Sequence, residues 1–476
     1  MIPVLLIALP IFSGLVAFFM KGQSVKSWAL LSSLAVLGIS VWSLFSNASL
    51  LSYDQAWLPS IGSRFNLVMQ DGLSKLMCLL TALSFPLVFI STQQNNSNQS
   101  PQFFALMLLT QAGLMGVFLS ADALLFYFFW ELALIPVYFL CSIWGGEKRI
   151  AVTFKFFIYT FVGSILMLVG ILSLYYMQGT PSFAWSSLTA NASKGIYPNW
   201  AFWLFFLAFA IKMPIFPLHT WQPDAYEQSP TPVTMILSGV MVKMGLFAAI
   251  RWLLPLFPKA SEQFAWVIVC CSVIGMIYAS LLAIRQDDIK RLIAYSSIAH
   301  IGLMSAVIFS GNASGMSGVM IQMFHHGINV IGLWIVANAI EQKLGTRSLS
   351  EMGGLAQKAP LLSILLVVMS LANVALPLTN AFVGEFLMFN SLFKYNIWLT
   401  AVAGISIILA AVYTLNMVQK VIYGELNTLT EKATDTSFNV NFSLALIAIL
   451  IIVMGVYPQP LLDLTKDAVT QLFAQQ

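Results

Sequence analysis

Long apolar stretches separated by short polar segments run along almost the whole chain. Each is long enough, at 1.5 Å of helical rise per residue, to cross the ~30 Å hydrocarbon core of a bilayer. The pattern predicts an all-α polytopic membrane protein with about 14 transmembrane helices in a single membrane domain, 1–476. The expected spans are 2–20, 27–46, 71–91, 102–120, 122–143, 152–177, 200–226, 231–254, 264–284, 291–310, 315–341, 360–392, 397–423 and 440–457.

Two of these spans are longer than a membrane requires. Residues 200–226 and 360–392 would reach about 40 and 50 Å as straight helices. The first contains Pro214 and Pro217, and the second contains Pro377. Proline removes a backbone donor and clashes with the preceding turn, so we expect a broken helix in each span. Broken helices in corresponding positions of two halves are typical of inverted repeats with a site at the midplane, and an ordinary proline kink is the alternative.

The composition supports the membrane class. Apolar residues make up 59% of the chain and charged residues only 8%, whereas soluble domains have about 25% charged residues. The net charge of +4 gives no indication of nucleic-acid binding. The cysteines lack metal-ligand spacing, and we interpret them as buried, reduced thiols. They are Cys78, Cys141, Cys270 and Cys271.

The distribution of lysine and arginine predicts the orientation of the chain. With the N-terminus outside, the inner loops hold 13 of these residues and the outer side holds seven, while the remaining two lie inside apolar spans. Because positive residues concentrate in cytoplasmic loops, this bias predicts that both termini lie outside. The longest loop, Ser52 to Gln70, is interpreted as a short hairpin outside the bilayer.

Four charged residues lie deep inside the apolar spans: Glu131, Lys212, Lys243 and Glu385. A charge at bilayer depth costs on the order of 3 kcal/mol even on lenient insertion scales, so such residues are usually functional. The alternatives are a carboxylate at a helix end, a lysine that snorkels to the headgroups, or a capping role for Glu385. Their depth favours a role in moving an ion.

The histidines extend this set. His300 ends the polar cluster AYSSIAH, and His326 follows His325 within IQMFHHGI. Adjacent helical residues point about 100° apart, so only one of the pair can face a given partner. We expect His300 and His326 to carry protons or to be satisfied polar residues. Neither a metal-ligand spacing nor a phosphate-binding loop or nucleophile motif is present, so no metal or covalent chemistry is predicted.

Several blocks of the chain resemble one family, the antiporter-like membrane subunits of respiratory complex I. The similarity extends over about residues 60–425 and favours the subunit M type, because related subunits usually have lysine where this chain has Glu385. The blocks are FFWELALIPVYFL, FAIKMPIFPLHTWQPDAYEQSPTP, MVKMGLFAAIRW, DDIKRLIAYSSIAHIGLMS, IQMFHHGI and LPLTNAFVGEF.

The resemblance implies two inverted five-helix repeats, 102–254 and 264–423, followed by a C-terminal amphipathic helix at 457–476 that braces neighbouring subunits. It also implies a buried path for protons. In this path Glu131 partners Lys212, Lys243 connects the halves, His300 and His326 form a polar relay, and Glu385 is the terminal acid. His325 departs from the family pattern, which leaves open which histidine of the pair lies in the path.

The implied function is proton translocation as a membrane subunit of NADH:quinone oxidoreductase, a translocase of the bacterial inner membrane. No cofactor is expected in this chain, because NADH, FMN, iron–sulfur clusters and quinone would be bound by partner subunits. The expected partners are other membrane subunits of the complex, including homologous ones, and lipids, with no nucleic acid. Alternatives are a monovalent-cation/proton antiporter subunit, a membrane subunit of an energy-converting hydrogenase, and a passive scaffold.

Overall fold

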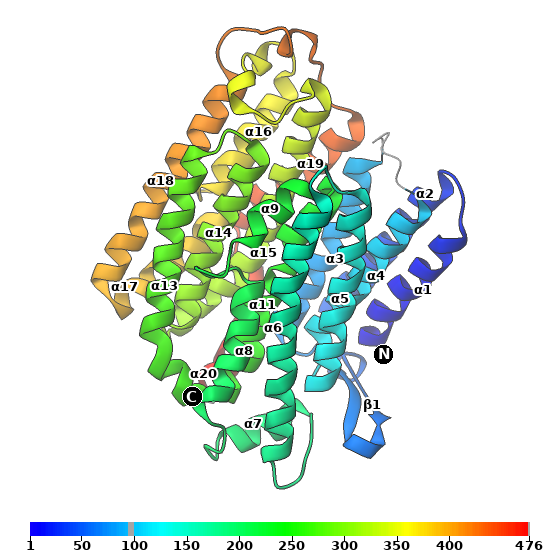
Figure 1. Ribbon diagram of the computed structural model, residues 1–476, viewed down its shortest axis with the longest axis vertical. Helices are drawn as coiled ribbons and strands as arrows, with labels where there is room; N and C mark the ends of the chain where they lie inside the picture. Colours follow the sequence, from blue (N-terminus) through cyan, green and yellow to red (C-terminus); the bar gives the residue numbers. More distant parts are fainter. Residues whose placement is uncertain (94–99, 475–476) are drawn as a thin grey trace.

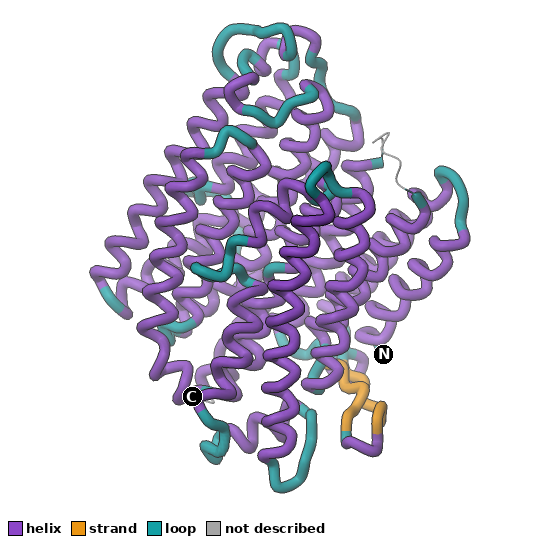
Figure 2. Tube along the Cα trace, in the orientation of Figure 1, coloured by secondary structure: helices purple, strands orange, loops and turns teal. Residues whose placement is uncertain are grey.

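The computed structural model describes residues 1–93 and 100–474 and is almost entirely helical (Figures 1 and 2). Within these residues, 12 helical stretches are long and apolar enough to cross a membrane. They are α1 (Ile2–Phe19), α2 (Ser24–Leu44), α3 (Gly72–Thr92), α4 (Pro101–Leu119), α5 (Ala123–Trp144), α6 (Arg149–Met177), the stretch Thr231–Leu256, α13 (Pro258–Arg285), α14 (Ile289–Ile308), α15 (Ala313–Leu344), α18 (Ile397–Ile422) and α19 (Phe438–Val456).

The two overlong spans are broken helices, as the sequence predicts. The first consists of α8 (Asn199–Lys212) and α9 (Trp221–Gln228), and the second consists of α16 (Pro360–Asn373) and α17 (Asn380–Tyr395). No single one of these four helices is long enough to cross the bilayer alone, because at 1.5 Å per residue they reach at most about 24 Å. The number of 14 crossings therefore stays a prediction, whereas the breaks are confirmed.

The first break is shaped by prolines and by rearranged backbone hydrogen bonds. The amide of Ile215, which follows Pro214, donates to Ala210 O at 3.0 Å. The indole of Trp221 on α9 donates to Ile211 O at 3.0 Å. Carbonyls at the end of α8 therefore find donors beyond the break, which satisfies groups that would otherwise be buried without a partner.

The second break is held in a strained backbone conformation. Ala375 and Leu378 have φ values of 53° and 75°, in the left-handed region that non-glycine residues seldom adopt. α19 approaches this segment closely at Gly455, where a Cβ would lie 2.2 Å from Leu378 O. Each left-handed residue costs roughly 1–2 kcal/mol, so surrounding contacts must hold the break in place.

Two elements form the centre of the bundle. The apolar window of α15 and that of Thr231–Leu256 are completely buried in the protein. The second stretch is interrupted by wide π-helical turns, which are frequent at functional sites. Its parts are α10 (Thr231–Ile236), η3 (Leu237–Met241), α11 (Lys243–Ala248), η4 (Ala249–Leu253) and α12 (Leu254–Leu256), of which η3 and η4 are π-helical.

A β-hairpin and a short helix lie at one end of the bundle, and long loops that include η5, η6 and η7 cover the opposite end (Figures 1 and 2). The expected hairpin is present as the antiparallel strands β1 (Ser52–Leu58) and β2 (Ser63–Val68). Helix α7 (Trp185–Ala192), the N-terminus and the last described residues of α20 lie toward the same end as the hairpin. The short 3₁₀ turns are η1 (Ala48–Leu50), η2 (Pro59–Ile61), η5 (Leu349–Glu351), η6 (Leu355–Gln357) and η7 (Thr430–Lys432).

The C-terminal segment forms helix α20 (Gln459–Ala474). The last two residues of the expected helix, 475–476, lie outside the described residues. α20 buries Thr465, Val469 and Leu472 on one face, and it crosses α3 at Gly72, where a Cβ would collide with Leu464 O. The amphipathic helix α20 packs with this face against α3 and α15.

One sequence interpretation needs correction. Cys78 and Cys141 are buried free thiols, as expected, but Cys270 and Cys271 are only partly buried. These two residues lie on α13, whose sequence is apolar on nearly all sides, so hydropathy alone did not distinguish its packed face from its open face.

Candidate functional site

Lys212 is the last residue of α8 and is only 2% exposed. Its Nζ atom has no hydrogen-bond partner among the described residues and no carboxylate at salt-bridge distance. The ammonium lies 5.6 Å from the centre of the Trp130 ring, a cation–π contact. The expected close pair between Lys212 and Glu131 is therefore not formed in this structure.

Glu131 occupies a less enclosed position than the sequence indicated. It is partly buried and shares a stripe of α5 with Phe128 and Ile135, which are 47% and 49% exposed. The Ser164 hydroxyl of α6 lies beside its carboxylate. Glu131 thus stands at the edge of the isolated chain, because α5 packs into the bundle through its other face.

Lys243 is completely buried and has direct partners. Its Nζ donates to Ser238 O at 2.6 Å and lies 2.8 Å from His326 Nδ1. Ser238 belongs to the π-helical turn η3. In such a turn the helix widens and the regular pattern of backbone hydrogen bonds is interrupted, so a carbonyl can accept from a side chain. Sequence reasoning missed this carbonyl, because a local widening of a helix leaves no clear pattern in the residues.

A row of three further groups continues from Lys243. The ring of His326 lies 5.4 Å from the ring of His300, measured between centres. His300 Nδ1 lies 3.0 Å from Glu385 Oε1. Lys243, His326, His300 and Glu385 come from α11, α15, α14 and α17, so tertiary packing brings together four residues spread over the sequence. We call this set the second-half row.

The structure distinguishes the two adjacent histidines. His326 contacts Lys243 and His300, whereas His325 is buried on another side, near the backbone of Asn380. His219 lies in the first break and stacks on Phe216. Of these three histidines, only His326 belongs to the second-half row.

Buried amides and hydroxyls support the second break, and the sequence did not indicate which of them would pair. Asn329 and Asn380 exchange two hydrogen bonds, at 2.9 and 3.0 Å. Ser296 accepts from both Asn373 and Tyr413 at 2.9 Å. The segment SLANVALPLTN, which joins the end of α16 to α17, is mostly apolar. Only the fold shows that these polar groups meet around the break before Glu385.

Charged residues also gather at the end of the bundle opposite the β-hairpin. Arg291 lies 3.2 Å from Asp224 and 2.6 Å from Glu227, which ties α14 to α9. We call the whole group the far-end ion cluster. Its members are Lys155, Asp224, Glu227, Asp288, Lys290, Arg291, Glu341 and Arg347.

The loop beside this cluster holds a stabilised carboxylate. Burial acts to raise the pKa of Asp287, but hydrogen bonds from Ser348 and Ser350 outweigh it and hold the pKa below its ordinary value. Asp287 therefore stays ionised over a wider pH range than a free aspartate.

The described residues, 1–93 and 100–474, contain no group of three His, Cys, Asp or Glu residues placed to bind a metal ion. The titratable groups described above have the chemistry that proton transfer requires. Two buried lysines, two histidines and two carboxylates can each gain and lose a proton, and four of them lie close enough to form a row.

The interrupted helices and the buried titratable row define a polytopic membrane protein of the transporter type. A sequence profile described as "NADH:quinone oxidoreductase/Mrp antiporter, TM" matches residues 120–412. The chain belongs to this family.

Individual relatives agree with the profile. The chain is 36% identical over 436 residues to a Rhodobacter capsulatus protein named NADH-quinone oxidoreductase subunit M, covering 88% of this chain and 83% of the relative. The Escherichia coli (strain K12) protein of the same name is 33% identical over 491 residues, covering 98% and 96%. A chain in the structure of respiratory complex I from Thermus thermophilus with bound NADH aligns with a TM-score of 0.89 and 30% identity, over 99% of both chains.

Proposed function

We propose that this chain is the subunit-M-type, proton-translocating membrane subunit of NADH:quinone oxidoreductase, a translocase driven by redox reactions in partner subunits. The observation that carries the proposal is the second-half row, which connects a wholly buried lysine to a carboxylate 9% exposed, across four helices. The likeness to relatives named subunit M supports the same function.

The proposal includes the organisation of the chain in the membrane. The broken helices fall in corresponding places of 102–254 and 264–423, which supports two inverted repeats. The bias of lysine and arginine supports both termini on the outer side of the bacterial inner membrane. NADH, FMN, iron–sulfur clusters and quinone belong to partner subunits, and other membrane subunits and lipids cover the apolar exterior.

The first step of the mechanism is electrostatic. A buried ammonium is stabilised by a nearby anion, and two unit charges attract by roughly 4 kcal/mol at 4 Å and roughly 2 kcal/mol at 8 Å when the effective dielectric constant is about 20. The difference equals about 1.5 pH units of proton affinity. Approach of the Glu131 carboxylate therefore favours the protonated form of Lys212, and its withdrawal favours loss of that proton. Lys212 has no carboxylate partner in this structure.

The second step uses the row in the second half. The Lys243 ammonium donates toward His326 Nδ1, so transfer of that proton leaves a neutral amine and an imidazolium. The imidazolium releases its other proton toward His300, which passes a proton to Glu385 through the 3.0 Å contact. Each step breaks one N–H bond and forms one N–H or O–H bond. Moving one charge across 100 mV requires about 2.3 kcal/mol, so the energy must come from the redox reaction elsewhere.

The test is the ratio of protons pumped per electron by the reconstituted complex. Glu131→Gln, Lys212→Ala and Glu385→Ala should each lower this ratio more than they lower assembly of the complex. If the three assembled variants pump at the wild-type ratio, the residue assignments are wrong.

The second candidate is a monovalent-cation/proton antiporter subunit, since the matching profile also describes Mrp antiporters. Glu385 favours the first candidate, because its carboxylate contacts His300 and can accept a proton from it. Transport in vesicles that depends on sodium, and that persists without NADH, would favour the antiporter.

A further inference from the structure

Two consecutive turns of α14 contact the two halves of the second broken helix. Ser296 lies four residues before His300, so their side chains stand on nearly the same side of α14, one turn apart. The amide of Asn373, the last residue of α16, donates to Ser296 Oγ at 2.9 Å. His300 Nδ1 lies 3.0 Å from Oε1 of Glu385, which belongs to α17. Polar groups of α14 therefore join both sides of the break.

A tyrosine from a further helix completes the contact at Ser296. The hydroxyl of Tyr413, on α18, donates to the same Oγ atom at 2.9 Å. A hydroxyl oxygen has two lone pairs, so Ser296 can accept from Tyr413 and Asn373 at once. All three side chains are buried, with at most 7% of each residue exposed. We call these three residues, Ser296, Asn373 and Tyr413, the Ser296 clamp.

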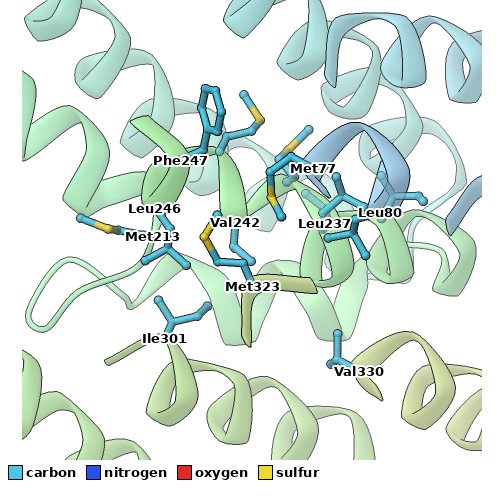
Figure 3. Packing of buried hydrophobic residues seen from close by; sticks show 14 of the residues in the cluster. Met77, Leu80, Met213, Leu237, Val242, Leu246, Phe247, Ile301, Met323 and Val330 are labelled. Atoms are coloured by element: carbon cyan, nitrogen blue, oxygen red, sulfur yellow. The ribbon is translucent and has the colours of Figure 1, made fainter. Parts of the chain in front are cut away.

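The clamp is directional, whereas the apolar packing of the same helices is not. Figure 3 shows Ile301 of α14 and Met323 of α15 among the buried apolar side chains of the core. Apolar contacts are non-directional, so they resist separation of two helices more than a slight rotation of one of them. A hydrogen bond weakens steeply when its angle departs from the preferred range. The clamp therefore restricts the rotation of α14 in a way that apolar packing does not.

A small rotation of α14 matters for the second-half row. The tip of a helical side chain stands about 5–6 Å from the helix axis, so a rotation of about 10° moves it by about 1 Å. Proton transfer needs a donor and an acceptor within about 2.6–3.2 Å, and a misplacement of about 1 Å can lower a rate roughly 100-fold. The contact between His300 and Glu385 is already 3.0 Å long. Rotation of this size would therefore take His300 out of reach of Glu385.

We propose that the Ser296 clamp positions His300 for proton transfer to Glu385, which makes Ser296 a positioning residue of the second-half row. This inference rests on the proposed function. Ser296 binds the end of α16 and a side chain of α18, and it thereby fixes the turn of α14 that precedes His300. The clamp itself neither gains nor loses a proton. In the step that it supports, the His300 imidazolium loses an N–H proton and the Glu385 carboxylate forms an O–H bond with it.

The two adjacent serines of the cluster AYSSIAH have different surroundings. Ser296 and Ser297 are both at most 2% exposed. Adjacent residues of a helix point about 100° apart, so the two hydroxyls face different neighbours. Ser296 is the one that accepts from α16 and α18. Ser297 shares the turn, the burial and the chemistry of Ser296, which makes it a matched control for the clamp.

The test uses Ser296→Ala in the whole complex, reconstituted into proteoliposomes. Loss of the shared acceptor releases α14 from α16 and α18, so we expect the ratio of protons pumped per electron to fall about threefold. A purely structural role of Ser296 would lower thermal stability and leave this ratio unchanged. Ser296→Thr keeps the hydroxyl and should retain the wild-type ratio, and so should the control Ser297→Ala.

A milder variant keeps the test decisive if Ser296→Ala fails to assemble. Tyr413→Phe keeps the shape of the side chain and removes one hydrogen bond, so it should assemble and lower the ratio about 1.5-fold. Because both changes act on one acceptor, the double variant Ser296→Ala/Tyr413→Phe should pump no worse than Ser296→Ala.

Three results would overturn the clamp. They are wild-type ratios in both Ser296→Ala and Tyr413→Phe, an equal loss in Ser297→Ala or Ser296→Thr, and losses that multiply in the double variant. If Glu385→Ala lowers the ratio while both clamp variants pump normally, the clamp is wrong and the proposed function stands. Wild-type pumping in Glu385→Ala as well would count against the proposed function itself.

Discussion

The two buried lysines are chemically identical, yet their surroundings differ in every respect that matters for proton transfer. Lys212 ends a broken helix and has an aromatic ring as its neighbour, with no hydrogen-bond partner among the described residues. Lys243 lies inside the stretch Thr231–Leu256, just after the π-helical turn η3, and has a carbonyl and an imidazole within 2.8 Å. Burial alone therefore does not define a proton carrier. The first lysine is suited to control by a distant charge, and the second is suited to transfer through contacts.

The two helix breaks show the same contrast. The first is satisfied by rearranged backbone hydrogen bonds and one indole, without a left-handed non-glycine residue. The second contains Ala375 and Leu378 in the left-handed region and is surrounded by paired amides. The break beside the isolated lysine is relaxed, and the break beside the connected row is strained and held by polar contacts.

The largest effect should come from Lys243→Leu. Because Lys243 is the only titratable residue that contacts His326 Nδ1 within the described residues, coupled pumping should fall roughly tenfold or more. The measurement is the pH gradient formed by inverted membrane vesicles during NADH oxidation. Should Lys243→Leu pump normally while Lys212→Ala fails, the second-half row does not conduct protons.

The next largest effect should distinguish the two adjacent histidines, His325 and His326. His326→Gln breaks the row between Lys243 and His300, so pumping should fall about fivefold. His325→Gln changes a buried residue outside the row and should alter pumping by less than about twofold. The proton-to-electron ratio of the purified variants measures both. Equal losses in the two variants would mean that the position of His326 in the row has no special importance.

The amide pair at the strained break should affect stability more than transport. Asn380→Ala leaves the Asn329 amide buried without its partner, which should cost about 1–3 kcal/mol. Thermal unfolding of the purified complex, followed for this subunit, measures the loss. The double variant Asn329→Ala/Asn380→Ala should be less destabilised than the sum of the single variants, and strict additivity would show that the pair is not coupled.

The far-end ion cluster should show the smallest effect. Arg291→Gln removes contacts to Asp224 and Glu227, but its side chain is 30% exposed and other cations stay close to both acids. We expect a loss of stability of at most about 1 kcal/mol that shrinks as salt is added. Unfolding at low and high ionic strength measures this difference. A loss that does not depend on salt would indicate packing of the arginine stem as its cause.

Much of this architecture could be predicted from the sequence. Hydropathy placed the helices, and prolines marked both breaks, because a bilayer requires long apolar helices and proline cannot complete their backbone hydrogen bonds. The six candidate residues were found because charge and polarity inside an apolar span are rare. The sequence left open which histidine joins the row, and it did not indicate that Glu131 stands at the edge of the chain or that Lys212 lacks a carboxylate at salt-bridge distance.

The sequence by itself therefore determined the class of protein, the approximate position of nearly every helix and the set of titratable residues inside the membrane. Only the tertiary structure decided which of those residues touch. Contacts such as Lys243 with His326, and Met213 with Gly245, join segments that are distant in the chain or separated by a break. Their distances depend on how helices rotate and pack against one another, and hydrophobic periodicity does not specify that geometry.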